Sequence, residues 1–252
     1  MLWPGLVSVT FRKLSPPEIV RACVAARLEG IEWGGDIHVP HGDLAAARQV
    51  AALTLEAGLR IAAYGSYYRL GEAPDSFDRV LATAVALQAP IIRVWAGRMG
   101  SNEATPELRA RVVDDARRVA ELASQAGLRV TSEWHGGTLT DTRESAAAFL
   151  AAVQHDNFRT YWQPRGHLPF SDCLRDLEAA LPRLAGLHVF QWDPRTKARL
   201  PLQDGDAVWP SYLAKAAQAG NMFALLEFVR NDDPAQLAKD AAVLRAWLAA
   251  GT

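Results

Sequence analysis

Four polar side chains lie in or directly after apolar, strand-like segments in the second half of the sequence. The segments read RVTSEWHGG, RTYWQPRGH, GLHVFQWD and FALLEFVR, and the polar residues are Glu133, Gln163, His188 and Glu227. A carboxylate between large apolar residues, as in LLEFV, is expected to be buried and to need a partner. Taken singly, each residue is equally compatible with a structural ion pair or a core histidine. Taken together, two carboxylates, an imidazole and a carboxamide can hold a divalent cation or transfer protons.

The elements that must position these residues follow one repeated pattern. The segments EAGLRIAAY and QAGLRVTSE are nearly identical, and looser copies recur along the chain. Each copy begins near a glycine suited to closing a helix and continues into a short apolar strand. The strands are predicted near residues 5–11, 30–35, 59–65, 90–96, 128–134, 158–163, 186–192 and 222–229.

A helical pattern follows each predicted strand, and helix-start signals support it. Ser15 precedes two prolines and Glu18, Thr105 precedes Pro106, and Asp233 precedes Pro234. These are typical N-terminal caps. Strict alternation of strand and helix requires parallel strands. We therefore predict a single-domain (β/α)8 TIM barrel over residues 1–252. The alternative, an open doubly wound sheet, lacks the glycine-rich phosphate turn.

In such a barrel the working face lies at the carboxyl ends of the strands. The last four strands adjoin, so Glu133, Gln163, His188 and Glu227 are expected to converge. Two facing carboxylates repel each other, and a divalent cation between them removes that repulsion. The pattern predicts Mn²⁺ or Mg²⁺, with Co²⁺ or Zn²⁺ as further candidates. His135 lies two residues after Glu133, so it is expected on the same side, within reach of a substrate hydroxyl.

Several segments together resemble a known family. They are GIEWGGDIHVPHGD, RVWAG, SEWHGG, HVFQWD, RLPLQDGD and LLEF. Their order and spacing resemble the xylose isomerase-like barrels known as sugar phosphate isomerases and epimerases. Relatives in that family include ketose 3-epimerases, hydroxypyruvate isomerase and inosose dehydratase. The resemblance covers essentially the whole chain.

The resemblance implies a ligand set and a chemistry. The family's metal ligands fall on Glu133, Gln163, His188 and Glu227. The second ligand is most often Asp in the family, and a carboxamide coordinates without adding charge, which implies weaker binding here. In the family the two glutamates transfer protons beside a carbonyl, and the metal stabilises the enediolate charge. The catalytic residues would therefore be Glu133 and Glu227.

Substrate-binding residues are predicted from two sources. The family pattern places a substrate histidine on His167 and an arginine on Arg199. Polar and aromatic residues at or beyond the predicted strand ends supply the other candidates: His135, Trp95, Trp33, Glu32 and His38. Core packing is an equal alternative for the aromatic residues, and Arg93 could pair with an inner carboxylate.

The predicted function is a metal-dependent sugar isomerase or epimerase acting on a small keto-sugar or polyol-derived substrate. A dehydratase or lyase on the same barrel is an alternative, because it needs the same proton abstraction. A non-catalytic sugar-binding barrel with a decayed metal site is a third hypothesis, supported only by Gln163. The segment FVRNDDPAQ is acidic where a phosphate-binding loop would carry glycines, so an unphosphorylated substrate is favoured.

Composition limits the other classes. The net charge is −1 with no basic tract, which argues against nucleic acid and against the DNA-repair endonucleases that share this barrel. No apolar run reaches the roughly eighteen residues of a membrane span. Cys23 and Cys173 fall in helical patterns, and no secretory signal is recognisable, so a cytoplasmic protein with reduced thiols is expected. A homo-oligomer is compatible with the sequence.

Overall fold

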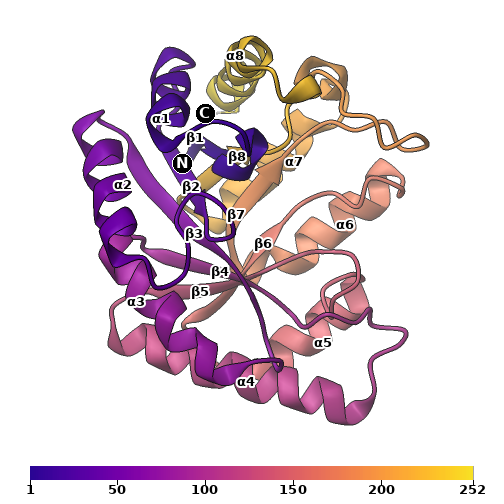
Figure 1. Ribbon diagram of the computed structural model, residues 1–252. Coiled ribbons are helices and arrows are strands. Elements are labelled where there is room, and N and C mark those ends of the chain that lie inside the picture. The colour runs from indigo at the N-terminus through magenta and orange to yellow at the C-terminus, as the bar shows by residue number, and fades with distance from the viewer. Residues whose placement is uncertain (252) are drawn as a thin grey trace.

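A computed structural model describes residues 1–251. The chain forms one closed barrel of eight parallel strands in the order β1 to β8, surrounded by eight helices (Figure 1). The strands are β1 (Leu2–Val7), β2 (Gly30–Gly34), β3 (Arg60–Arg69), β4 (Ile91–Trp95), β5 (Arg129–Glu133), β6 (Phe158–Trp162), β7 (Leu184–Val189) and β8 (Met222–Leu226). The predicted (β/α)8 TIM barrel is confirmed.

Three of the helices begin where Ser15, Thr105 and Asp233 predict. The helices are α1 (Pro16–Ala25), α2 (Leu44–Glu56), α3 (Phe77–Leu87), α4 (Pro106–Gln125), α5 (Arg143–Val153), α6 (Phe170–Ala180), α7 (Trp209–Ala216) and α8 (Pro234–Ala250). Ser15 and Glu18 form a capping box at α1, and the Thr105 side chain accepts a hydrogen bond from the Leu108 amide at α4. Cys23 and Cys173 are buried on α1 and α6 as free thiols.

Four predicted strands had wrong boundaries. β3 continues four residues beyond its predicted end at residue 65, to Arg69. β1 begins at Leu2 and ends at Val7, and Ser8–Phe11 continue as a 3-10 helix instead of a strand. β7 covers 184–189, and the expected last residues form a loop. β8 ends at Leu226, and two residues later Phe228 has a left-handed backbone conformation with φ of 57°, which interrupts regular extended backbone.

The barrel interior is filled by small and apolar side chains below the carboxyl ends of the strands. This interior cluster consists of Val7, Val9, Ala62, Ala63, Tyr161 and Leu225. Gly186 leaves room for the Tyr161 ring, since a Cβ at this position would lie 2.5 Å from a ring carbon. Tyr161 in turn contacts the His188 ring edge-on at 5.5 Å between centroids. The packed interior thus supports the His188 ring from below.

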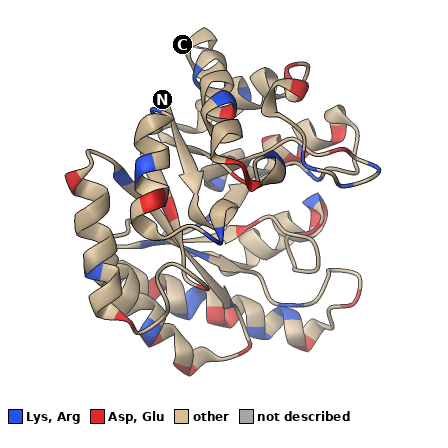
Figure 2. Ribbon diagram, turned by 45° about the horizontal axis from the view of Figure 1, so that its top comes forward, with Lys and Arg blue, Asp and Glu red and all other residues tan. Residues whose placement is uncertain are grey.

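Charged side chains are distributed over the outside of the barrel. Lys and Arg are interspersed with Asp and Glu over the helices and loops (Figure 2). Among the described residues, no helix is long and apolar enough to cross a membrane.

Candidate active site

The carboxyl ends of β5 to β8 bring together the four residues that the sequence singled out. Glu133 is the last residue of β5, Gln163 follows β6, His188 lies in β7 and Glu227 follows β8. His188 Nδ1 lies 3.4 Å from Glu133 Oε1 and 3.6 Å from Glu227 Oε2. Gln163 Nε2 lies 3.3 Å from Glu133 Oε1. Glu133, His188 and Glu227 are all buried.

A buried arginine stands between two carboxylates at the floor of the site. Arg93, on β4, donates from Nε to Glu32 Oε1 at 2.6 Å and from its Nη1 to Glu133 Oε2. Glu32 also lies 3.4 Å from His188 Nε2 through its other oxygen. The Trp95 indole donates to Glu133 Oε2 at 2.6 Å. Glu133 is therefore held by two donors on one oxygen, whereas the structure gives Glu227 no side-chain hydrogen bond among residues 1–251.

Burial and charge shift the pKa values of these groups in different directions. Burial acts to raise the pKa of Glu133, but Arg93 and His188 outweigh it and hold the pKa well below its usual range. Burial raises the pKa of Glu227 to about 7, offset in part by the charge of His188. Burial acts to lower the pKa of His188, but the charges of Glu227 and Glu32 raise it to about 10. Without metal, these shifts favour an anionic Glu133 and a cationic His188 at neutral pH, and they let Glu227 take up a proton more readily than an ordinary glutamate.

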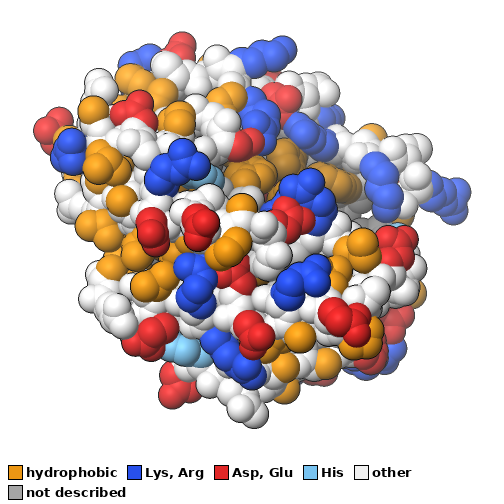
Figure 3. All heavy atoms as spheres, turned by 60° about the horizontal axis from the view of Figure 1, so that its bottom comes forward, with side chains coloured by type: hydrophobic (Ala, Val, Ile, Leu, Met, Phe, Trp, Pro, Cys, Tyr) orange, Lys and Arg blue, Asp and Glu red, His pale blue; other side chains and the backbone are white. Residues whose placement is uncertain are grey.

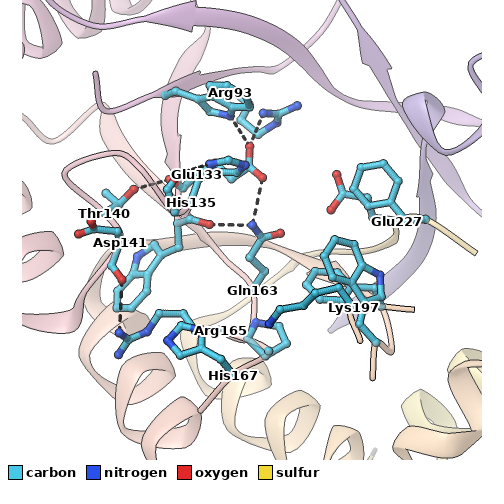
Figure 4. A pocket seen from close by; sticks show the side chains of 18 of the residues that line it. Arg93, Glu133, His135, Thr140, Asp141, Gln163, Arg165, His167, Lys197 and Glu227 are labelled. Atoms are coloured by element: carbon cyan, nitrogen blue, oxygen red, sulfur yellow. Dashed lines mark hydrogen bonds and ion pairs between the residues drawn. The ribbon is translucent and has the colours of Figure 1, made fainter. Parts of the chain in front are cut away.

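The donor set at this floor fits a divalent cation. Glu133, His188 and Glu227 each offer one ligand atom, and these atoms lie within 4.8 Å of one another. Gln163 donates its amide to the Trp134 carbonyl at 2.8 Å, and its buried Oε1 has no hydrogen-bond partner among residues 1–251. In Figure 4 the Gln163 amide lies between Glu133 and Glu227. A buried oxygen without a donor calls for an explanation, and a cation provides one.

A pocket of about 460 Å³ opens above this floor. Its aromatic walls are formed by Tyr67, Trp95, Trp134, Phe190, Trp192 and Phe228. His135 stacks on Trp95 with 4.5 Å between ring centroids and 22° between planes. A hollow with apolar side chains inside it and Lys and Arg side chains around it is visible in Figure 3. Such walls suit a small substrate with one apolar face.

Some of the predicted substrate-binding residues line the pocket, and the others lie outside it. His135, His167 and Trp95 line the pocket. Glu32 is fully buried below it, paired with Arg93 and His188. The alternative that Arg93 pairs with inner carboxylates therefore agrees with the structure, although Arg93 also reaches the pocket wall.

Trp33, His38 and Arg199 do not line the pocket formed by the described residues. Trp33 is buried and donates to Thr54 Oγ1 on α2 at 3.2 Å, because it follows Glu32 and so points to the opposite face of β2. His38 is buried against Ser8 Oγ at 3.0 Å. Arg199 pairs with Asp232, and its guanidinium lies 4.6 Å over the Phe228 ring. Their predicted role in binding substrate finds no support in this placement.

Several lining residues were not among the predicted site residues. Arg12, Tyr67, Arg165, Lys197 and Phe228 reach the pocket. Tyr67, Lys197 and Phe228 have φ of 57°, 61° and 57°. Left-handed backbone is unusual for bulky residues and concentrates at functional sites. A glycine would have signalled such a conformation in the sequence, and none stands at these positions.

With the fold and the site in place, comparisons with known proteins assign the family. A model of the xylose isomerase-like TIM barrel family matches residues 20–247, so this chain belongs to that family. A curated 3-dehydroshikimate dehydratase from Bacillus anthracis is 37% identical over 68 residues, which is 27% of this chain and 24% of that protein. The chain thus matches about a quarter of that relative's length.

Solved structures share the fold. A probable 3-DHS dehydratase from Bacillus anthracis, involved in petrobactin synthesis, has a TM-score of 0.81 and 23% identity, with 97% of this chain and 99% of that chain covered. A xylose isomerase-like barrel from Mycobacterium smegmatis in complex with magnesium has a TM-score of 0.75 and 18% identity, over 99% and 97%. The D-psicose 3-epimerase of Clostridium cellulolyticum H10, solved with D-tagatose, has a TM-score of 0.73 and 13% identity, over 99% of both chains. At these identities the likeness concerns the fold alone.

Proposed function

We propose that this protein is a metal-dependent dehydratase, which removes a proton beside the carbonyl of a small polyhydroxylated compound and then releases water. The observation that carries the proposal is the unequal surroundings of the two glutamates. Glu133 is fixed by Arg93 and Trp95, and Arg93 keeps its pKa low. Glu227 has no such donor, and its pKa is raised to about 7. A general base must be free to take up a proton, and Glu227, which no side-chain donor holds within residues 1–251, meets that condition better than Glu133.

Four residues would hold the metal: Glu133, Gln163, His188 and Glu227. A bound Mn²⁺ or Mg²⁺ would stabilise negative charge that develops on the carbonyl oxygen of the substrate. Glu133 then serves as a permanently charged ligand rather than as a proton carrier. Arg93 and Trp95 keep that carboxylate in one orientation.

Glu227 carries the proton in the proposed reaction. Its carboxylate takes a proton from the carbon beside the carbonyl, and the electrons of that C–H bond form a new carbon–carbon double bond. The hydroxyl on the neighbouring carbon leaves with its bonding electrons and takes the proton back from Glu227, so that water is released. No oxidant or reductant is needed. His135, which stacks on Trp95 at the wall, would hold a substrate hydroxyl.

One proton carrier favours dehydration over epimerisation. Epimerisation needs a proton removed from one face of a carbon and returned to the other, hence two carriers with suitable pKa values. Dehydration that removes the proton and the hydroxyl from the same face of the substrate needs only one proton carrier. The similarity to dehydratases over part of the sequence and in the fold agrees with this choice.

Sugar isomerisation or epimerisation is the second candidate. It is favoured by the presence of two carboxylates at the floor, since Glu133 and Glu227 come from different strand ends and lie 3.4 Å and 3.6 Å from His188 Nδ1, so that both could reach a substrate bound there. It is also the activity of an epimerase that shares the fold.

Product analysis distinguishes the candidates. Protein stripped with a chelator and reloaded with Mn²⁺ or Mg²⁺ is incubated with 3-dehydroshikimate, D-tagatose and D-psicose, and products are followed by proton NMR. The proposal predicts a dehydrated product that forms only in the reloaded samples. If the ketohexoses are epimerised and no dehydrated product forms, the result contradicts the dehydratase proposal and supports the second candidate. Absence of turnover with both metals would contradict both.

A further inference from the structure

One cation at the pocket lacks an anionic partner. Arg12 pairs with Asp36 at 2.5 Å, and Arg165 pairs with the buried Asp176 at 2.7 Å. Arg93, at the floor, is likewise paired with carboxylates. Lys197 also lines the pocket, and within residues 1–251 no ion pair or hydrogen bond of its side chain is found. The wall therefore carries one uncompensated positive charge.

The loop that carries Lys197 is built to hold it in place. Residues 191–200 fold back on themselves, with Asp193 N donating to Ala198 O at 2.8 Å and Lys197 N donating to Asp193 O at 2.9 Å. The Asp193 carboxylate accepts hydrogen bonds from the amides of Arg195 and Thr196 at 2.9 Å and 2.7 Å. This turn imposes the left-handed φ of 61° on Lys197. Such conformations persist only where the surroundings fix them.

The position of the loop directs this charge at the pocket. The loop is the orange segment that projects between β7 and α7 in Figure 1. In Figure 4, Lys197 lies on the same side of the pocket as Arg165 and His167, across from Glu133. A substrate whose reacting carbon faces Glu227 therefore presents its other end to this basic wall. His167 is exposed there and can add a hydrogen bond.

We infer that the substrate is an acid, and that Lys197 binds its carboxylate. This deepens the proposed function and rests on it for placing the substrate in this pocket. A single lysine on a mobile stem suits a monoanionic carboxylate at the pocket mouth. A phosphate ester usually calls for several backbone amides at a helix start, and the loop after β8 presents Asp232 and Asp233 instead.

The inference is tested by binding, so that its result does not depend on turnover. Metal-loaded protein is titrated by calorimetry with two pairs of probes matched in shape: 3,4-dihydroxybenzoate against 3,4-dihydroxybenzamide, and D-galacturonate against D-galactose. At least one acid is expected to bind about tenfold more tightly than its neutral partner, as one charge-assisted hydrogen bond provides. Lys197→Gln should remove that preference and leave the neutral probe unchanged. Lys197→Arg should retain most of it.

Arg195→Gln is the matched control, since Arg195 is exposed on the same loop but does not line the pocket. It should change the preference by less than about twofold, because Arg195 does not reach a probe bound in the pocket and its more distant charge is screened by salt. Equal affinity for acid and neutral probe, or an equal loss in both variants, would overturn the inference. The inference would also be overturned if neither acid bound at about 10 mM. A preference for D-galactose 6-phosphate over D-galacturonate would overturn it as well. A protein that prefers the acid but forms no dehydrated product would keep this inference and refute the proposed reaction.

Discussion

Glu133 and Glu227 approach the same nitrogen of His188, at 3.4 Å and 3.6 Å, but only Glu133 is bonded to Arg93. Because Arg93 contacts only one of these two glutamates, their carboxylates differ in their affinity for a proton. The arginine keeps Glu133 ionised, and burial without such a partner leaves Glu227 able to take up a proton near neutral pH. The following predictions depend on this difference.

Arg93→Met should strongly destabilise the protein. The substitution keeps much of the side-chain volume but removes the cation that lies nearest to the buried Glu32 and Glu133. Removing one partner of a buried ion pair costs about 3–5 kcal/mol of unfolding free energy. Urea denaturation of metal-free protein measures the change. The control is Arg98→Met, whose exposed pair with Glu72 should contribute less than about 1 kcal/mol. Equal losses in both variants would show that Arg93 has no special structural role.

The metal-free protein should lose stability as pH rises from about 4.5 to about 10. The pKa of His188 is raised from 6.5 to about 10 in the folded protein, so its contribution is complete below 6.5 and disappears as pH rises through 10. The pKa of Glu227 is raised from 4.5 to about 7, so its contribution has the same sign and is lost as pH rises through 7. Thermal unfolding at a series of pH values follows both losses.

His188→Gln should flatten the upper part of this profile, above about pH 7. The matched control is His167→Gln, since His167 is exposed at the pocket rim and should leave the profile unchanged. A wild-type melting temperature that stays constant or rises between pH 7 and 10 would be inconsistent with a protonated His188 in the metal-free protein.

Gln163→Asp should tighten metal binding and destabilise the metal-free protein. The new carboxylate adds a charge to a ligand set that has two. It also loses the amide that donates to the Trp134 carbonyl and lies 3.3 Å from Glu133, and it places a like charge near Glu133. Calorimetric titration with Mn²⁺ and thermal unfolding without metal measure the two effects. Weaker binding in the variant would show that Gln163 is not a ligand or that the shorter side chain cannot reach.

Much of the fold could be predicted because its signals are local. Proline and capping residues such as Ser15 and Thr105 mark helix starts, and alternation of strand and helix leaves few topologies. The convergence of Glu133 and Glu227 followed from that topology, since the carboxyl ends of neighbouring parallel strands share one edge of the barrel.

The features of the site that the sequence did not predict depend on the direction of side chains and on the geometry of loops. Trp33 follows an inward-facing residue, and the sequence does not reveal which of Glu32 and Trp33 points inward. Arg199 and Lys197 lie two residues apart, yet one pairs with Asp232 and the other lines the pocket. The left-handed turn that separates their directions is set by hydrogen bonds within the loop.

Solvent exchange in D₂O tests the central claim, that Glu227 is the proton carrier and Glu133 is not. Metal-loaded wild type, Glu227→Gln and Glu133→Gln are incubated with the substrate found by product analysis, and deuterium at the carbon beside the carbonyl is followed by NMR together with turnover.

We predict that Glu227→Gln loses both deuterium exchange and turnover, by about 10²–10⁴-fold, because a carboxamide cannot take up a proton. Glu133→Gln should retain measurable exchange once enough metal is added to compensate for its weaker binding. The reverse pattern, with exchange kept in Glu227→Gln and abolished in metal-saturated Glu133→Gln, would contradict the assignment.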